Sequence, residues 1–253
     1  MSVRFIAEDG IALITLDRPE VRNAVDKPTA DAISSALDEL DARADITVGV
    51  LAGSGTVFSA GMDLKAFSAT RERPVTEQRG AFGIVQQPSA KPLIAAVEGK
   101  ALGGGFEIAL ACDLIVAADD AKFGLPEVKR GLVAAAGGVL RLPRRIPRTI
   151  AMEIVLTGGP IDAPRAADLG LINRVVPSGT ATEQALELAR LIAANAPLAV
   201  RTAKRLVDES GDWPFTEAFA RQAPYTDAVR SSKDADEGAR AFVEKRAPVW
   251  LGA

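Results

Sequence analysis

Histidine is absent from this chain of 253 residues, and cysteine occurs once, as Cys112. The lack of histidine excludes Ser-His and Cys-His nucleophiles, imidazole metal ligands and histidine proton shuttles. With a single cysteine, no internal disulfide can form and a metal site is not expected. If the protein is an enzyme, carboxylates, amines or backbone dipoles must carry its chemistry.

Aromatic residues make up only 5% of the chain, so we expect a core of Ala, Val, Leu and Ile. No apolar run approaches the roughly 20 residues that a membrane helix needs, and no membrane partner is expected. The formal net charge of -3 gives no electrostatic reason to expect nucleic acid. Residues 1–5 lead into a strand-like alternation without the features of a secretory signal, which together with the single cysteine favours a cytoplasmic protein.

Strand and helix patterns alternate through the first part of the chain, which favours an α/β layered fold. Short apolar runs predict strands at 3–7, 11–16, 47–52, 93–97 and 113–117, and helical spacing predicts helices at 26–44 and 104–111. After Pro177 the pattern predicts only helices, at 182–194, 198–209, 215–229 and 234–245. We therefore divide the chain into an α/β core, residues 1–195, and a helical region, residues 196–253. The second region is small for a core of its own and is expected to pack on the first or on a neighbouring subunit.

Three consecutive glycines, 103–105, stand at the start of the helix predicted at 104–111. Glycine is costly in backbone entropy, and a turn alone seldom needs three. A helix N-terminus presents unpaired N–H donors and a partial positive charge, which suit a developing oxyanion. Glu107 lies in the first turn, where it is either a catalytic carboxylate or a complement to the helix dipole.

Two further segments combine small or apolar residues with groups suited to chemistry. In residues 57–65, Ala60 and Gly61 leave backbone amides open to a ligand, although a simple connector would also explain them. Glu127 follows a proline among apolar residues, where desolvation would raise its pKa toward that of a working acid or base. A surface glutamate paired with Lys129 or Arg130 is the simpler interpretation of that segment alone.

Other motifs are absent or less informative. The spacings of a dinucleotide fingerprint, a P-loop and a nucleophile elbow do not occur. A run of four arginines could contact ligand phosphates, but a solvated helix face is the favoured interpretation; the run is Arg141, Arg144, Arg145 and Arg148. Cys112 is most simply a small buried apolar residue.

Taken in order, these segments resemble the crotonase superfamily, the enoyl-CoA hydratase/isomerase group. Residues 58–64 resemble its first oxyanion-hole loop, residues 101–107 its second loop with a catalytic glutamate, and residues 123–127 the segment with the second glutamate. The likeness extends from 18–24 to 244–250, nearly the whole chain. It implies a spiral of β-β-α units followed by an all-helical trimerisation region, with trimers often paired into hexamers.

The resemblance also implies an acyl-CoA substrate, with no cofactor beyond that coenzyme A and no metal. By matched position, the N–H groups of Ala60 and Gly104 would hold the thioester oxygen, and Glu107 and Glu127 would be catalytic. The implied coenzyme A site consists of Arg22, Ala60, Gly61, Met62, Asp63, Leu64, Gly104 and Lys245.

Family hydratases use both glutamates, and both are present here. This favours reversible addition of water to a 2-enoyl-CoA, giving a 3-hydroxyacyl-CoA, as in fatty acid metabolism. We expect Glu127 to deliver the proton to C2 and Glu107 to orient the water. Double-bond isomerisation and a non-catalytic acyl-CoA- or RNA-binding scaffold remain alternatives. Residues 132–142 depart from the usual hydratase stretch and resemble a branch with crotonobetainyl-CoA hydratase-like proteins, which leaves the acyl group open.

Overall fold

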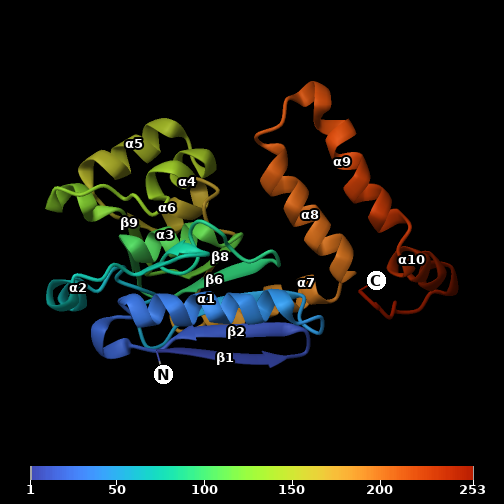
Figure 1. The fold of residues 1–253 in the computed structure, drawn as a ribbon, viewed down its shortest axis with the longest axis horizontal. Helices are drawn as coiled ribbons and strands as arrows, with labels where there is room; N and C mark the ends of the chain where they lie inside the picture. The colour runs from blue at the N-terminus through green and yellow to red at the C-terminus, as the bar shows by residue number, and fades with distance from the viewer. Residues whose placement is uncertain (1, 253) are drawn as a thin grey trace.

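A six-stranded sheet lies at the centre of the computed structural model, which describes residues 2–252 (Figure 1). Met1 and Ala253, the outer ends of the two predicted regions, lie outside the described residues. The strand order is β1-β2-β3-β6-β8-β11, with β1 antiparallel to β2 and the remaining pairs parallel. The strands are β1 (Val3–Glu8), β2 (Ile11–Leu16), β3 (Val48–Gly53), β6 (Leu93–Val97), β8 (Leu114–Ala118) and β11 (Arg174–Val176).

Helices cover both faces of this sheet, because alternate strand residues are apolar on each face. Leu51 and Ala95 belong to the main core, which includes α1 (Lys27–Ala42) and α3 (Gly104–Ala111). Their strand neighbours Val50 and Ile94 pack with α7 (Ala181–Ala193) in a second cluster. The core is mainly aliphatic, as expected from the small number of aromatic residues, with Phe58, Phe106 and Phe123 fully buried in it.

A second, three-stranded sheet has the order β10-β9-β7 and positions the site. Its strands are β7 (Lys100–Leu102), β9 (Lys122–Gly124) and β10 (Ile161–Asp162). Strands β7 and β9 are parallel, with Leu102 opposite Gly124. The chain leaves β7 into α3 and leaves β9 toward the 3-10 helix η2 (Pro126–Arg130), so these two segments begin side by side at one edge of the sheet.

Shorter elements complete the body. A small hairpin, β4 (Val75–Thr76) and β5 (Gly80–Ala81), follows α2 (Leu64–Thr70). The 3-10 helix η1 (Pro19–Val21) precedes α1, and three helices that the sequence patterns did not predict lie between η2 and β11. They are α4 (Gly138–Arg145), α5 (Arg148–Thr157) and α6 (Ala163–Asp168).

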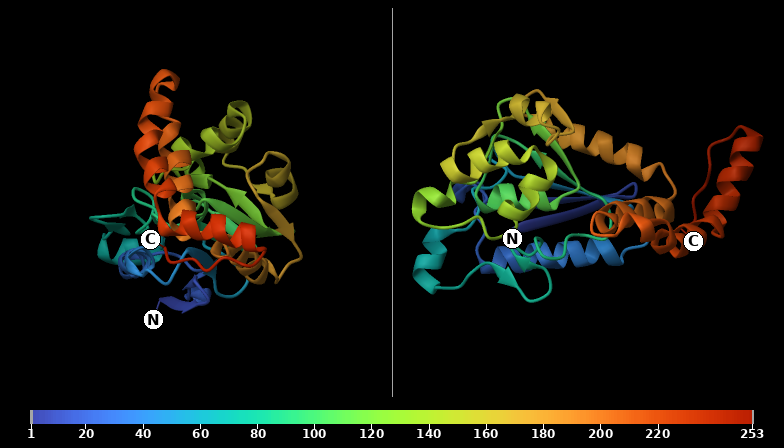
Figure 2. Two further views of the ribbon diagram at one scale, coloured as in Figure 1. Left: turned by 90° about the vertical axis from the view of Figure 1, so that its right-hand side faces the viewer. Right: turned by 90° about the horizontal axis from the view of Figure 1, so that it is seen from above.

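The last three helices extend from the body as an arm, seen in orange to red in Figures 1 and 2. This C-terminal arm consists of α8 (Pro197–Ser210), α9 (Phe215–Arg230), α10 (Lys233–Glu244) and the residues that follow to 252. An ion pair between Lys204 and Asp113 and a hydrogen bond from the Trp250 indole N–H to the Ala194 carbonyl (2.8 Å) link it to the body. The predicted division at residue 195 falls between α7 and α8.

No helix in the described part of the chain combines the length and the apolar character that crossing a bilayer demands.

Candidate active site

Glu107 is a buried carboxyl in the first turn of α3. The residue is only 3% exposed, and its carboxyl Oε1 accepts a hydrogen bond from the Gly138 N–H at 2.9 Å. Burial raises the pKa of Glu107 to about 7, the negative charge of Glu127 adds to the rise, and the Gly138 N–H opposes it. Glu107 can therefore exchange a proton near neutral pH, as an acid-base group must.

Glu127 lies on η2, shortly after β9, and its side chain lies beside the start of α3. Its Oε1 lies 3.3 Å from where a Cβ on Gly103 would stand. Its Oε2 is buried and accepts no hydrogen bond from the described residues. Burial raises the pKa of Glu127 as well. A buried carboxyl oxygen without a partner is uncommon in folded proteins and calls for an explanation. The simpler sequence interpretation is wrong, because neither Lys129 nor Arg130 forms an ion pair with Glu127 within residues 2–252.

The loop of residues 58–62 is joined to β7 by backbone hydrogen bonds. The Ser59 N–H donates to the Lys100 carbonyl, and the Leu102 N–H donates to the Ser59 carbonyl, both at 3.2 Å. Gly61 has a φ of +86°, and a Cβ there would stand 2.6 Å from the Gly104 nitrogen. Only glycine allows this approach. The structure thus brings the two predicted loops together at the start of α3.

The amide of Ala60 is not free, which corrects the prediction that it holds the thioester oxygen. Its N–H donates to the Arg22 carbonyl at 3.0 Å, and the Asp63 N–H donates to the Val25 carbonyl at 2.9 Å. These two bonds pair the loop with residues 22–25, and the Met62 amide between them takes no part in the pairing. The N–H groups of Met62 and Gly104 have no acceptor in the part of the chain that the structure describes. Met62 therefore replaces Ala60 as the candidate donor beside Gly104.

Most of the predicted coenzyme A residues adjoin this loop. Asp63 caps α2 by accepting the Ala66 N–H at 3.0 Å, and its carboxylate pairs with Arg18 at 3.2 Å. Leu64, the first residue of α2, is exposed. Lys245 is the exception, because it lies just beyond α10 on the arm, at the opposite end of the molecule from α2 (Figures 1 and 2). Within one chain the structure does not bring Lys245 to the other predicted residues.

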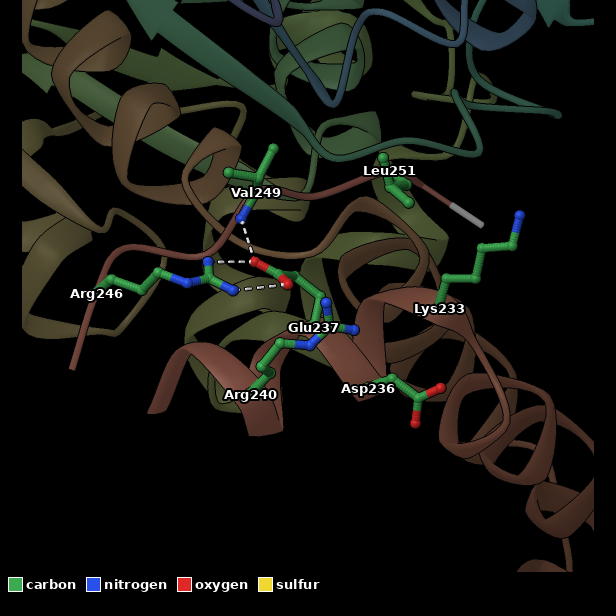
Figure 3. Close-up of a pocket in the computed structure, with 7 residues that line it drawn as sticks. All are labelled: Lys233, Asp236, Glu237, Arg240, Arg246, Val249 and Leu251. Carbon is green, nitrogen blue, oxygen red and sulfur yellow. Dashed lines mark hydrogen bonds and ion pairs between the residues drawn. The ribbon is translucent and has the colours of Figure 1, made fainter. Parts of the chain in front are cut away.

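A cavity of about 500 Å³ beside α10 lies away from the glutamate pair, and Figure 3 shows its lining. There Glu237 accepts two hydrogen bonds from Arg246, at 2.6 and 3.0 Å, and one from the Val249 N–H at 2.9 Å. The Arg246 guanidinium lowers the pKa of Glu237 to about 2. This carboxylate is fully engaged in holding the C-terminal residues against α10, so we do not assign it a catalytic task. Over residues 2–252, no cluster of three or more His, Cys, Asp or Glu could hold a metal ion.

The arginine run is divided between two environments, so its prediction as a solvated face is only half right. Arg144 and Arg148 are exposed. Arg141 donates to the Val85 carbonyl at 2.5 Å and Arg145 to the Cys112 carbonyl at 2.6 Å. Burial lowers the pKa of both inward-facing guanidinium groups. Their long side chains leave α4 on its inner side, which the charge run alone could not indicate.

Comparisons with known proteins identify the family to which the chain belongs. The family model described as enoyl-CoA hydratase/isomerase matches residues 7–253. The chain is 43% identical over 244 residues to enoyl-CoA hydratase EchA19 of Mycobacterium tuberculosis, covering 93% of this chain and 91% of the relative. It is 42% identical over 247 residues to a carnitinyl-CoA dehydratase of Salmonella typhi, covering 94% of each.

Among solved structures, enoyl-CoA hydratase EchA1 of Mycobacterium marinum matches with a TM-score of 0.97 and 51% identity, over 100% of this chain and 99% of the other. An enoyl-CoA hydratase of Mycobacterium tuberculosis H37Rv matches with the same TM-score, identity and coverage. These matches confirm the fold class that the ordered motifs predicted. The chain belongs to the enoyl-CoA hydratase/isomerase family.

Proposed function

We propose that this protein is an enoyl-CoA hydratase, adding water reversibly across the C2=C3 bond of a 2-enoyl-CoA to give a 3-hydroxyacyl-CoA. One observation carries the proposal: the buried Glu107 and the half-buried Glu127 flank the start of α3, where the free amide of Gly104 lies beside that of Met62 on the neighbouring loop. A hydratase needs one group to activate water, one to protonate carbon, and donors for the enolate oxygen.

The partners of the two glutamates support a division of labour. Glu107 accepts the Gly138 N–H, which stabilises its ionised form, so we assign it the role of base. Glu127 has a buried oxygen without a donor and a raised pKa, so it can carry the proton that the pair shares, and we assign it the role of acid. Like charges at close range oppose double ionisation, and the pair then shares one proton near neutral pH.

The steps balance without any further reactant. Glu107 takes a proton from water as the water oxygen bonds to C3, and the π electrons of the C2=C3 bond move toward the thioester. Charge then accumulates on the thioester oxygen, which the N–H groups of Met62 and Gly104 bind. Glu127 gives its proton to C2, restoring the carbonyl, and the proton now on Glu107 passes to Glu127 by exchange with solvent, which returns the pair to its starting state. Removing one such amide donor typically costs about 3 kcal/mol of transition-state stabilisation.

The curated relatives support the same class of reaction, since one is named an enoyl-CoA hydratase and another a carnitinyl-CoA dehydratase. Loss or gain of water beside a thioester needs the same two proton transfers in either direction. The coenzyme A moiety comes with the substrate, and we propose Arg22 and residues 60–64 as its binding segment.

We further propose that the chain works as a trimer, alone or paired into a hexamer. The C-terminal arm exposes large apolar side chains that a monomer would leave in water: Phe215 is 81% exposed, Phe219 68% and Phe242 85%. Phe215 and Phe219 pack against each other on α9, and exposed apolar patches mark protein interfaces. In an assembly, Lys245 would approach the coenzyme A of a neighbouring subunit, because it cannot reach that of its own.

Incubation of the purified protein with 2-enoyl-CoA esters tests the reaction. Hydration removes the conjugated double bond, so its absorbance should fall, and in deuterium oxide the product should carry one deuterium at C2. The isomerase alternative predicts conversion of 3-enoyl-CoA to 2-enoyl-CoA without uptake of water. Absence of hydration across a range of acyl chains would refute the proposal.

A further inference from the structure

Phe82 has a backbone conformation that bulky residues rarely adopt. Its φ is +56°, in the left-handed region, although it carries an aromatic side chain. Such strain persists only where the surroundings enforce it, and it concentrates at ligand sites. The residue is 6% exposed and belongs to the main core.

Arg79 anchors one side of the segment that carries Phe82, residues 79–88. Its guanidinium is buried, at 2% exposure, and pairs with Asp38 at 2.8 Å and Asp41 at 2.9 Å, both on α1. The same group donates to the carbonyls of Gln87 and Pro88. This arginine therefore ties both ends of the segment to one helix.

Two further contacts anchor the middle of the segment. Gly83 lies so close to α1 that a Cβ there would stand 2.1 Å from the Ala30 carbonyl oxygen. On the other side, Arg141 of α4 donates to the Val85 carbonyl. With α1 and α4 holding it, the segment keeps Phe82 in its strained conformation.

The Phe82 ring lies against the start of α3. A Cβ on Gly104 would stand 2.2 Å from its Cζ and 2.6 Å from its Cε2. Gly104 is the residue whose amide we assign to the thioester oxygen, and Gly103 beside it faces Glu127. An acyl group bound through that oxygen has C2 and C3 one and two bonds from the carbonyl carbon, so we infer that they would lie close to the ring.

We propose that Phe82 is a specificity-determining residue, a rigid aromatic wall that restricts the substrate to compact acyl groups. This inference rests on the proposed function, because it takes the Gly104 amide as the anchor of the thioester. Its strained and doubly anchored backbone keeps the ring from moving aside for a longer chain. Truncating the ring should open space for that chain without removing a proton donor or an oxyanion donor.

The test compares wild type, Phe82→Ala and Phe82→Leu on 2-enoyl-CoA esters of increasing chain length. The readout is the ratio of kcat/KM for a ten-carbon ester to that for a four-carbon ester, which a uniform loss of activity leaves unchanged. Discrimination of a few methylenes in an apolar pocket reaches about tenfold or more. We expect Phe82→Ala to raise the ratio at least about tenfold and Phe82→Leu to raise it less.

Ile84→Ala is the matched control, since Ile84 lies in the same segment and is fully buried but is not among the atoms nearest to Gly104. It should leave the ratio at the wild-type value. An unchanged ratio in Phe82→Ala, or an equal rise in Ile84→Ala, would overturn the inference while leaving the hydratase proposal intact.

Calorimetry with saturated butyryl-CoA and decanoyl-CoA repeats the comparison without turnover. If the protein binds these esters but hydrates no 2-enoyl-CoA, the hydratase proposal fails. The ratio of the two dissociation constants then still tests the role of Phe82 in selecting acyl-chain length. A relative gain in affinity for decanoyl-CoA in Phe82→Ala supports the proposal that the ring limits chain length, and an unchanged ratio refutes it. Absence of binding to either ester would overturn both proposals.

Discussion

Glu107 and Glu127 differ in the donors around them, and exchange for glutamine affects each in a different way. Glutamine keeps the shape of the side chain but cannot transfer a proton. Glu127 makes no hydrogen bond through Oε2 to the described residues, whereas Glu107 is held by Gly138. The first exchange should therefore act mainly on chemistry and the second on both chemistry and stability.

Glu127→Gln should lose most turnover, on the order of a hundredfold or more, because general acid catalysis contributes roughly 10²–10⁴-fold. Affinity for a saturated acyl-CoA should stay close to wild type, since the coenzyme A segment is untouched. Steady-state kinetics and calorimetry measure the two effects. Glu153→Gln, on the exposed surface of α5, is the control and should keep full activity. Near-normal turnover in Glu127→Gln would remove this residue from the mechanism.

Glu107→Gln should change how stability depends on pH. The folded pKa of Glu107, about 7, lies above its ordinary value of 4.5. Between these values the native state binds more protons than the unfolded state, so the free energy of unfolding falls as pH rises toward 7 and stays low above it. One pKa unit corresponds to about 1.4 kcal/mol, which gives a loss of about 3 kcal/mol.

Urea unfolding at pH 5 and pH 8 measures this effect. Glu107→Gln still accepts the Gly138 N–H but has no proton to lose, so it should be more stable than wild type at pH 8 and closer to it at pH 5. Glu153→Gln should follow the wild-type dependence at both values. A constant difference between Glu107→Gln and wild type at the two pH values would contradict the raised pKa.

At the scale of elements, the segment 79–88 depends on Arg79. Arg79→Met should lower the free energy of unfolding by about 2 kcal/mol, because it removes two ion pairs and the donors to the Gln87 and Pro88 carbonyls, while the remaining aspartates stay partly solvated. Lys27→Met removes an exposed ion pair from the same helix and should cost less than about 1 kcal/mol. Denaturant titrations compare the two variants, and equal losses would show that burial of the Arg79 pairs adds nothing.

Local patterns predicted the regular elements of the fold but not the contacts that complete the site. Apolar spacing predicted a helix at 26–44, and α1 spans Lys27–Ala42 with Asp26 as its cap. The four predicted C-terminal helices correspond to α7–α10 within a few residues. The short helices α4–α6 were not predicted, because Pro143 interrupts α4, α5 is confined between Pro147 and Gly158, and α6 has only 6 residues.

Residue types and their order along the chain predicted part of the site. Glycines 103–105 and the two glutamates stand out in the sequence, and the structure brings them together. Which amide stays free was not predictable, because the pairing of Ala60 with Arg22 is a long-range contact. The same holds for Phe82, whose position depends on anchors from α1 and α4 that leave no periodic pattern.

At the scale of the whole molecule, the exposed apolar surface of the arm predicts association. Phe242→Asp should shift the protein toward monomers, since a charge within an apolar interface must be desolvated. Phe242→Leu retains the apolar contact and should keep the wild-type mass. Analytical ultracentrifugation distinguishes the species. A monomeric wild type, or an unchanged mass in Phe242→Asp, would contradict the proposed trimer.

Ser59 joins the loop of residues 58–62 to β7 through its backbone and to Asn23 through its hydroxyl, which donates to the Asn23 carbonyl at 2.8 Å. The Met62 and Gly104 amides cannot separate unless these hydrogen bonds of Ser59 break. The two amide donors for the negative charge are therefore positioned during folding, before any thioester binds. On heating, hydratase activity and the native circular dichroism signal should be lost in a single transition. No temperature range should contain a folded but inactive protein.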